Sequence, residues 1–246
     1  MNCLIVYPDE LGSDGVVRLI GDRARRALER HGLTVGANVT AGLRFGGLGR
    51  ATVLSVAVED VHLTFEHQRP APPRFPAELI VAVPRPQTVK KIVHLAVTLG
   101  LTHLHLVRTL KTVKSYLASS VLFPESLESE VLEGLEQGVD TVSPEIAIYP
   151  SFENFGAGAL REIAARAVHR HIADTHAPTV PMGTVLSAGS LALAIGPEGG
   201  WTELERTTFA AAGFAPLGLG ARMLRVEVAA ALALGQFGAL SPQTKV

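Results

Sequence analysis

Short runs in which apolar and polar residues alternate occupy the first 70 positions of the chain. Residues 35–43 and 51–58 are rich in Val, Thr and Ala, and they predict two strands joined by a glycine-containing hairpin turn at 44–50. Asp22 is expected to cap a short helix that runs through Arg30 and ends at Gly32. We therefore expect residues 1–70 to form a small all-β domain.

A proline-rich segment follows, with four prolines in the eight residues 69–76. Proline lacks the backbone N–H that a helix interior or a central strand requires, so such a segment disfavours both structures. We place a linker at 71–76 and a second domain at 77–246.

Beyond the linker, compact apolar runs alternate with stretches of helical spacing. Strands are expected at 78–83, 103–107, 146–149, 190–195 and 214–219, and helices at 89–99, 127–137, 157–172, 203–212 and 225–237. This alternation predicts an α/β fold with a mostly parallel sheet covered on both faces.

The composition narrows the class of protein. The 246 residues are 47% hydrophobic and 18% charged with a net charge of −1, which argues against disorder. Cys3 is the one cysteine, so the chain has no internal disulfide, and a reduced, partly buried thiol is expected. No transmembrane span or signal peptide is recognised, so we expect a cytoplasmic protein without a membrane partner.

A buried strand at 191–195 leads directly into the glycine-rich loop 196–200. Thr202 and Glu205 have the spacing of a capping box at the start of the next helix. The glycines allow positive φ angles and close approach of a ligand to the backbone. Open α/β sheets bind small molecules at the carboxyl ends of their strands. Glu198 has little around it to pack against, which favours a chemical role over a simple connection.

The segment 217–231 repeats this arrangement of strand, glycine turn and helix, with Arg225 and Glu227 at the helix entrance. The chain has no Gly-x-x-x-x-Gly-Lys-Ser/Thr phosphate loop. Met223 stands where a dinucleotide fingerprint would have its third glycine. ATPase and nicotinamide-dependent chemistry are therefore disfavoured.

Together the two segments resemble the RsmE-type ribosomal RNA uridine-N3 methyltransferases of the SPOUT superfamily. The resemblance rests on Ile195-Gly196-Pro197-Glu198-Gly199-Gly200-Trp201 with Glu205, followed by Leu219-Gly220-x-x-x-Leu224-Arg225-x-Glu227. It implies a PUA-like, RNA-binding β-barrel ahead of a parallel-sheet SPOUT domain with a C-terminal trefoil knot, and a homodimer.

The resemblance also implies S-adenosyl-L-methionine as cofactor and 16S ribosomal RNA, or the small ribosomal subunit, as substrate. The cofactor-binding residues implied are Ile195, Gly196, Pro197, Glu198, Gly199, Gly200, Leu219, Gly220, Met223, Leu224 and Arg225.

The chemistry of such a reaction suggests roles for three charged residues. Uracil N3 is a weak nucleophile while protonated, so a cation such as Arg225 would favour the anionic base. Glu198 or Glu227 would accept the proton or orient the target, although a salt bridge is an equal alternative for Glu227. Since N3 lies on the Watson–Crick edge, the target base must be unpaired or flipped out.

The substrate side matches the family pattern less closely than the cofactor side. Its departures from the family are His94, Leu95, Thr98, Asp140, Val226 and Val228. Contacts to RNA phosphates are expected instead from Lys111, Thr112 and Lys114, with an ordinary solvated loop as the alternative.

Two pairs of histidines are candidate metal ligands. His103 and His105 share one face of an expected strand, whereas His169 and His171 fall on an expected helix and would not face each other. Neither pair has a third ligand at a convincing spacing, so no metal is expected.

Three functions remain open at this point. The first is methyl transfer to a uridine N3 of small-subunit ribosomal RNA. The second is methylation of a different RNA, or even of a non-RNA substrate, by an enzyme of the same fold. The third is a noncatalytic RNA-binding or ribosome-assembly protein that retains the fold.

Overall fold

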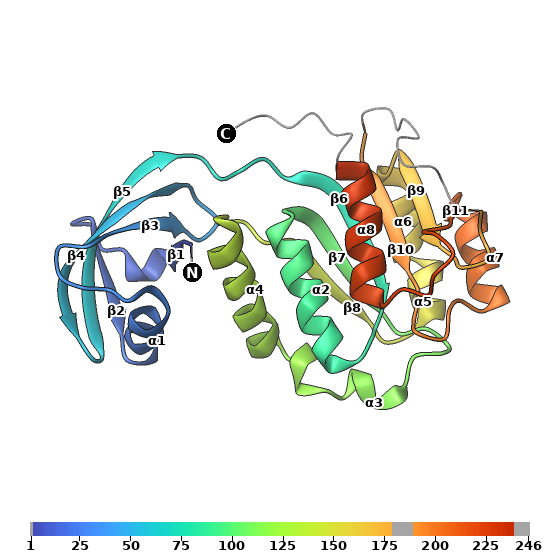
Figure 1. Ribbon diagram of the computed structural model, residues 1–246, viewed down its shortest axis with the longest axis horizontal. Helices are drawn as coiled ribbons and strands as arrows, with labels where there is room; N and C mark the ends of the chain where they lie inside the picture. The colour runs from blue at the N-terminus through green and yellow to red at the C-terminus, as the bar shows by residue number, and fades with distance from the viewer. Residues whose placement is uncertain (1, 179–188, 239–246) are drawn as a thin grey trace. The chain divides into compact units, whose positions relative to one another are not determined.

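The computed structural model describes residues 2–178 and 189–238, which contain two β-sheets (Figure 1). The chain divides into two compact units. The first consists of residues 1–73 with 131–143, and the second of residues 74–130 with 144–246.

The first unit is a curled sheet of five strands in the order β1-β3-β4-β5-β2. Strand β1 runs parallel to β3, and the remaining neighbours are antiparallel. The elements are β1 (Leu4–Val6), η1 (Pro8–Glu10), β2 (Val16–Ile20), α1 (Asp22–His31), β3 (Asn38–Leu43), β4 (Leu48–Ala57) and β5 (Asp60–Arg69). The predicted hairpin of two strands around 44–50 is confirmed.

The core of this unit lies between the sheet and α1, where Leu4, Leu19 and Leu63 are fully buried. The segment 131–143 belongs to the same unit, and the backbone N–H of Cys3 donates a hydrogen bond to the Glu136 carbonyl oxygen at 3.0 Å. Burial raises the pKa of the Cys3 thiol to about 12, so this cysteine is a buried apolar residue and not a nucleophile.

The second unit contains a six-stranded, wholly parallel sheet in the order β11-β9-β10-β6-β7-β8. Its strands are β6 (Phe75–Ala82), β7 (Leu101–Val107), β8 (Glu145–Tyr149), β9 (His169–Ala173), β10 (Leu191–Ile195) and β11 (Ala215–Leu217). Its helices are α2 (Pro86–Thr98), α3 (Lys114–Leu117), η2 (Ser120–Leu122), α5 (Phe152–Ala157), α6 (Ala159–Arg166), α7 (Glu203–Ala211) and α8 (Val226–Gly238), and the unit shares α4 (Pro124–Gly138) with the first unit.

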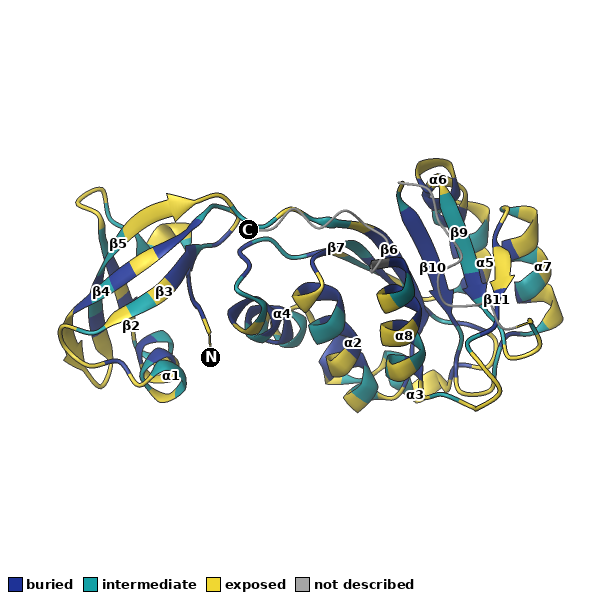
Figure 2. Cartoon of the chain, turned by 45° about the horizontal axis from the view of Figure 1, so that its top comes forward, coloured by how far each residue is buried: buried dark blue, intermediate teal, exposed yellow. Residues whose placement is uncertain are grey.

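Helices cover both faces of this sheet, as predicted (Figure 1). Helices α2 and α8 pack against each other and against β7 and β10, while α5, α6 and α7 cover the opposite face. Figure 2 shows that β10 is buried along its length. Such burial on both sides explains its uninterrupted apolar sequence.

The prediction of one long helix over 157–172 is wrong. The expected helix over 157–172 is instead the end of α5, the separate helix α6 and the strand β9. Alanine-rich sequence favours a helix locally. However, β9 pairs with β10 on one side and β11 on the other, and this pairing determines its conformation. His169 and His171 therefore lie on a strand.

Smaller differences occur at element ends. The last strand, expected over 214–219, is limited to β11. Helix α1 begins after Gly21, so Asp22 is its first residue and not its cap. Among the helices within 2–178 and 189–238, none is long and apolar enough to cross a membrane.

Candidate functional site

A pocket of about 510 Å³ opens at the carboxyl ends of β9, β10 and β11 in the second unit. It is lined by Lys111, Ala173, Asp174, Thr175, His176, Ile195, Gly196, Pro197, Glu198, Gly199, Gly200, Trp201, Arg206, Leu217, Leu219, Gly220, Arg222, Met223, Leu224, Val226 and Ala229. All predicted cofactor-binding residues except Arg225 are among them. The structure thus brings together two glycine loops that are some twenty residues apart in sequence.

The first glycine loop follows β10 and approaches its neighbours closely. Gly200 has a φ of 67°, a conformation that favours glycine. A Cβ atom on Gly196 would lie 3.1 Å from the Trp201 indole, and one on Gly199 would lie 3.2 Å from Lys111 Cδ. Close packing thus favours glycine at positions 196 and 199, and the positive φ angle favours it at position 200.

The capping box that begins α7 is present as predicted. The Thr202 hydroxyl accepts from the Glu205 N–H, and Glu205 Oε2 accepts from the Thr202 N–H at 2.8 Å. Glu205 is fully buried, and its Oε1 accepts a hydrogen bond of 2.8 Å from the Leu110 N–H. This carboxylate therefore connects the start of α7 to the loop after β7.

The second glycine loop connects β11 to α8. Gly220 has a φ of 112°, and Leu224 and Val226 line the pocket on either side of Arg225. The Arg225 side chain is exposed, and its carbonyl oxygen accepts from the Ala229 N–H in the first turn of α8. Arg225 itself is not a lining residue; its exposed side chain lies between two lining residues in the sequence.

The two predicted glutamates have different surroundings. Glu198 is exposed, and its carboxylate lies 3.7 Å from the Arg85 guanidinium. Glu227 accepts a hydrogen bond of 2.9 Å from Lys91 Nζ, which lowers its pKa. The Lys91 partner therefore favours the ionised form of Glu227.

Asp174, Thr175 and His176, which follow β9, form a third wall of the pocket that was not predicted from the sequence. Burial raises the pKa of Asp174, but hydrogen bonds from His176 and the charge of Arg206 outweigh burial and lower it. Polar residues directly after a strand indicate a binding site in a parallel sheet. This indication was lost because 169–173 was predicted to be part of a helix.

The side chains of Trp201, which is buried, and Arg206, which is half-buried, hold the loops around the pocket. Trp201 Nε1 donates to the Ala173 carbonyl oxygen at 3.0 Å, joining the first glycine loop to the end of β9. Arg206 donates to the Trp201 carbonyl oxygen at 2.9 Å and lies 3.8 Å from Asp174. These two side chains consequently connect the first glycine loop, the start of α7 and the end of β9.

The three residues predicted to bind RNA are placed differently from one another. Lys111 lines the pocket and donates to the Gly199 carbonyl oxygen at 2.7 Å. Thr112 is buried, and its hydroxyl accepts from the Thr109 N–H within its own loop. Lys114 is an exposed residue at the start of α3.

The residues that depart from the family pattern differ in their burial and contacts. Asp140 is buried and accepts from the N–H groups of Thr141 and Val142. Val226 is buried in the pocket wall, whereas Val228 is exposed. Leu95 is half-buried on α2, and Thr98 is exposed at its end.

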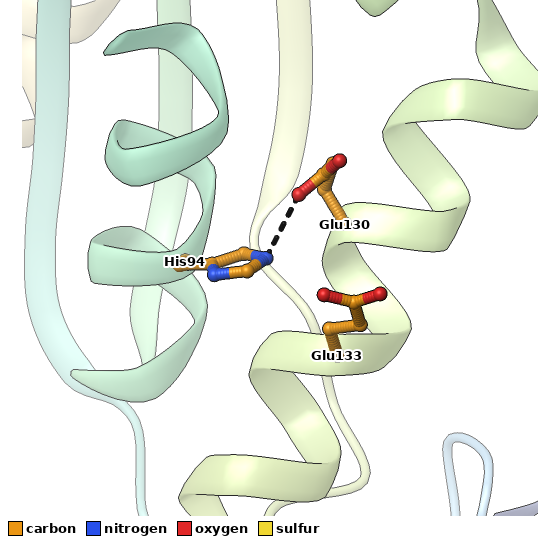
Figure 3. Close-up of side chains that lie close together, drawn as sticks. All are labelled: His94, Glu130 and Glu133. Carbon is orange, nitrogen blue, oxygen red and sulfur yellow. Dashed lines mark ion pairs between the residues drawn. The ribbon is translucent and has the colours of Figure 1, made fainter. Parts of the chain in front are cut away.

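Figure 3 shows His94 of α2 directed toward Glu130 of α4, with Nε2 at 3.0 Å from the carboxylate. Lys90 pairs with the same carboxylate. Glu133, one turn further along α4, pairs with Arg30. His94, Glu130 and Glu133 are close enough together to hold a metal ion. Because basic side chains pair with both carboxylates, we interpret the cluster as a set of ion pairs.

His103 and His105 do share one face of β7, with their rings stacked at 5.8 Å. His105 Nε2 lies 3.0 Å from Glu78 Oε2, and its Nδ1 lies 3.3 Å from the Tyr149 hydroxyl. Arg166 binds the other side of the Glu78 carboxylate. Among the residues that the structure describes, these contacts indicate that the histidine pair has a structural role beside the Glu78 carboxylate.

A family model for the RNA methyltransferase domain matches residues 71–238. Fold, pocket and match together define the second unit as an RNA methyltransferase domain. Ribosomal RNA small subunit methyltransferase E of Treponema pallidum is 34% identical over 206 residues, covering 82% of this chain and 76% of the relative. The protein of the same name from Synechocystis is 30% identical, covering 79% of this chain and 63% of the relative. The chain belongs to the ribosomal RNA small subunit methyltransferase E family.

Solved structures confirm the fold class along the whole chain. A ribosomal RNA small subunit methyltransferase E from Neisseria gonorrhoeae, bound to S-adenosyl methionine, superposes with a TM-score of 0.73 at 21% identity, covering 97% of this chain and 98% of that one. A protein from Legionella pneumophila, solved with the same cofactor, gives 0.75 at 19% identity over 97% and 98%. The fold is a PUA-like N-terminal sheet followed by a SPOUT domain.

Proposed function

We propose that this protein transfers a methyl group from S-adenosyl-L-methionine to N3 of a uridine in 16S ribosomal RNA. The observation that carries the proposal is the pocket between the two glycine loops at the carboxyl end of the parallel sheet, within a chain of this family. The relatives' shared name supplies the substrate class, the small-subunit ribosomal RNA.

The residues present fit the proposed cofactor. A volume of about 510 Å³ lies within the range of roughly 300–1,000 Å³ that small-molecule sites occupy. The glycines let the backbone of both loops line the pocket, and Asp174 and Glu198 supply negative charge suited to a sulfonium cation. S-Adenosyl-L-methionine supplies an activated methyl group when bound, so the chain's own residues are left to manage position and charge.

Arg225 and Glu198 then act on the uracil ring. Arg225, which stands between the pocket-lining residues Leu224 and Val226 and has an exposed side chain, stabilises the anion that forms when N3 loses its proton. Glu198, whose 3.7 Å pairing with Arg85 is the longer of the two glutamate pairings, accepts that proton. Glu227, held by Lys91, connects α8 to α2 and positions Arg225, two residues earlier.

The rest of the chain serves the RNA in this proposal. The first unit, with the predicted residues 1–70 and the segment 131–143, forms the RNA-binding domain, and the second unit forms the catalytic domain predicted at 77–246. The linker predicted at 71–76 includes the first two residues of β6. Lys111 and Lys114 contact phosphates, and Thr112 holds the loop that carries Lys111. Two copies form a homodimer that acts on the small ribosomal subunit or its RNA in the cytoplasm.

The test is methyl transfer to 16S RNA and to small subunits from a strain that lacks this modification. Mass spectrometry of nuclease digests should locate one 3-methyluridine. Arg225→Ala should reduce the rate at least 100-fold, whereas Arg161→Ala, an exposed arginine on α6, should leave it unchanged.

Two results would overturn the proposal. Methylation at a different base atom or in a different RNA would assign the protein to another substrate. S-Adenosyl-L-methionine binding without transfer to any ribosomal RNA would favour a noncatalytic RNA-binding role.

A further inference from the structure

Phe45 combines two features that rarely occur together in a hairpin turn. Its φ angle is 63°, a left-handed conformation that is unusual for a bulky residue. Its side chain is also 69% exposed, although an aromatic ring loses water-exposed apolar area by packing. A strained residue that presents an apolar ring to solvent points to a function, since neither feature favours folding.

The turn that carries Phe45 is fixed by hydrogen bonds within the first unit. The Phe45 N–H donates to the Thr141 carbonyl oxygen at 2.9 Å, and the Thr141 hydroxyl donates to the Gly46 carbonyl oxygen at 2.5 Å. The Arg44 N–H donates to the Val6 carbonyl oxygen at 2.8 Å. The ring is therefore held on a rigid support.

A buried arginine lies against one face of the ring. The Arg44 guanidinium carbon is 3.9 Å from the centre of the Phe45 ring, while the residue as a whole is only 4% exposed. Its nitrogens donate to the Thr141 carbonyl oxygen at 3.1 Å and to the Ser143 hydroxyl at 2.9 Å. The guanidinium stacks under one face of the ring and leaves the other face for a ligand.

The surface beside the turn carries two further basic residues. The exposed His67 ring lies against Gly47, where an added Cβ atom would be 2.1 Å from its Nε2. Arg69, also exposed, is paired in register with Leu48 at the end of the same turn. Of the acids in this unit, Glu66 is opposite Arg50 in the register, and Asp140 and Glu136 are buried.

We propose that Phe45 is a stacking platform for one unpaired base of the RNA substrate. A flat apolar ring, a guanidinium beneath it and the nearby exposed Arg69 match the base and phosphates of single-stranded RNA. The identity of the occupant rests on the proposed function, because the RNA is the substrate of the second unit. The site itself lies in the first unit and is distinct from the cofactor pocket.

The left-handed φ makes a clean test possible. Phe45→Gly removes the ring but accepts a φ of 63° without strain, so the variant should fold with an equal or higher melting temperature. Phe45→Trp keeps a stacking surface. Val58→Gly removes another exposed apolar side chain of the same unit, 71% exposed, and serves as the matched control.

The probe is a single-stranded ten-nucleotide RNA that contains 2-aminopurine, whose fluorescence is quenched by stacking. Phe45→Gly should abolish the quenching and weaken binding about 5- to 150-fold, which corresponds to the stacking energy of one base. Phe45→Trp and Val58→Gly should bind within twofold of the wild type. The KM for small-subunit RNA should rise in Phe45→Gly, with S-adenosyl-L-methionine affinity unchanged.

Three outcomes would overturn the stacking proposal. Equal quenching and equal KM in Phe45→Gly and wild type would remove Phe45 from RNA binding while leaving methyl transfer intact. A change in oligomeric state without a change in RNA affinity would make the ring a contact between copies of the chain. A wild type that binds neither the probe nor small-subunit RNA would overturn both this proposal and the proposed function.

Discussion

Lys111 Nζ lies 2.7 Å from the Gly199 carbonyl oxygen and joins the loop after β7 to the first glycine loop of the pocket. The aliphatic part of the same side chain covers Gly199, with Cδ at 3.2 Å from the place where a Cβ atom would be. One lysine therefore both binds and encloses the backbone of this loop.

We expect Gly199→Val to lower the affinity for S-adenosyl-L-methionine at least tenfold. The branched side chain displaces Lys111 and occupies space in the pocket wall. Isothermal titration calorimetry measures the change. Adding Lys111→Ala to the Gly199→Val variant should recover part of the affinity, because the clash then has no partner.

Gly158→Ala is the matched control for this substitution. Gly158 lies between α5 and α6, its φ is −122°, and an added Cβ atom would meet its nearest neighbour, the Asn154 carbonyl oxygen, at 3.7 Å. Affinity should stay within twofold of the wild type. Equal affinity in Gly199→Val and Gly158→Ala would place the cofactor away from the glycine loop.

The two glycine loops and the capping box were predictable because their signals are local. The apolar run that ends at Gly196 indicates a strand followed by a turn. Thr202, three residues before Glu205, indicates the start of a helix, and neither signal depends on distant residues. The third wall was not predictable, since 169–173 becomes a strand only through pairing with β10 and β11. The ion-pair partners of Glu198 and Glu227 come from α2, more than a hundred residues away, and no local pattern specifies them.

Glu198→Gln and Glu227→Gln should have unequal effects on catalysis. Loss of the proton acceptor Glu198 is expected to lower kcat by about 10²–10⁴-fold, the range of general-base catalysis. Glu227 already has a lowered pKa and a Lys91 partner, so its loss should cost less than tenfold. Single-turnover rates between pH 5 and 9 distinguish the two, and equal losses would assign the proton to a different group.

S-Adenosyl-L-methionine binding should change the intrinsic fluorescence of the protein. Trp201 is the single tryptophan of the chain, it lines the pocket, and it is 4% exposed. A titration followed by emission intensity should therefore give the same dissociation constant as calorimetry. Binding by calorimetry without any change in emission would indicate a ligand that binds elsewhere.

Trp201→Phe is the control for that titration. The substitution removes the emission and also the hydrogen bond from Nε1 to the Ala173 carbonyl oxygen, so unfolding should become easier by about 1 kcal/mol. Chemical denaturation followed by circular dichroism measures this loss, because that signal does not depend on the tryptophan.

The stability of the second unit should depend on pH through Glu78. Burial raises the pKa of Glu78, but the hydrogen bonds from His105 and Arg166 outweigh it and lower the pKa to about 2 from an ordinary 4.5. The folded protein thus binds this proton less readily than the unfolded chain does. The stabilisation is complete above pH 4.5 and is lost as the pH falls toward 2.

Glu78→Gln should therefore lower the free energy of unfolding at pH 7 by about 2 kcal/mol, the scale of hydrogen bonds to charged groups. The difference between wild type and variant should shrink steadily between pH 4.5 and pH 2, because the wild-type carboxylate becomes protonated over that range. Urea denaturation at a series of pH values measures both quantities. Glu162→Gln, an exposed carboxylate on the helix that carries Arg166, should show neither effect. A difference for Glu78→Gln that does not vary with pH would mean that side-chain packing, and not the ionised carboxylate, accounts for the loss.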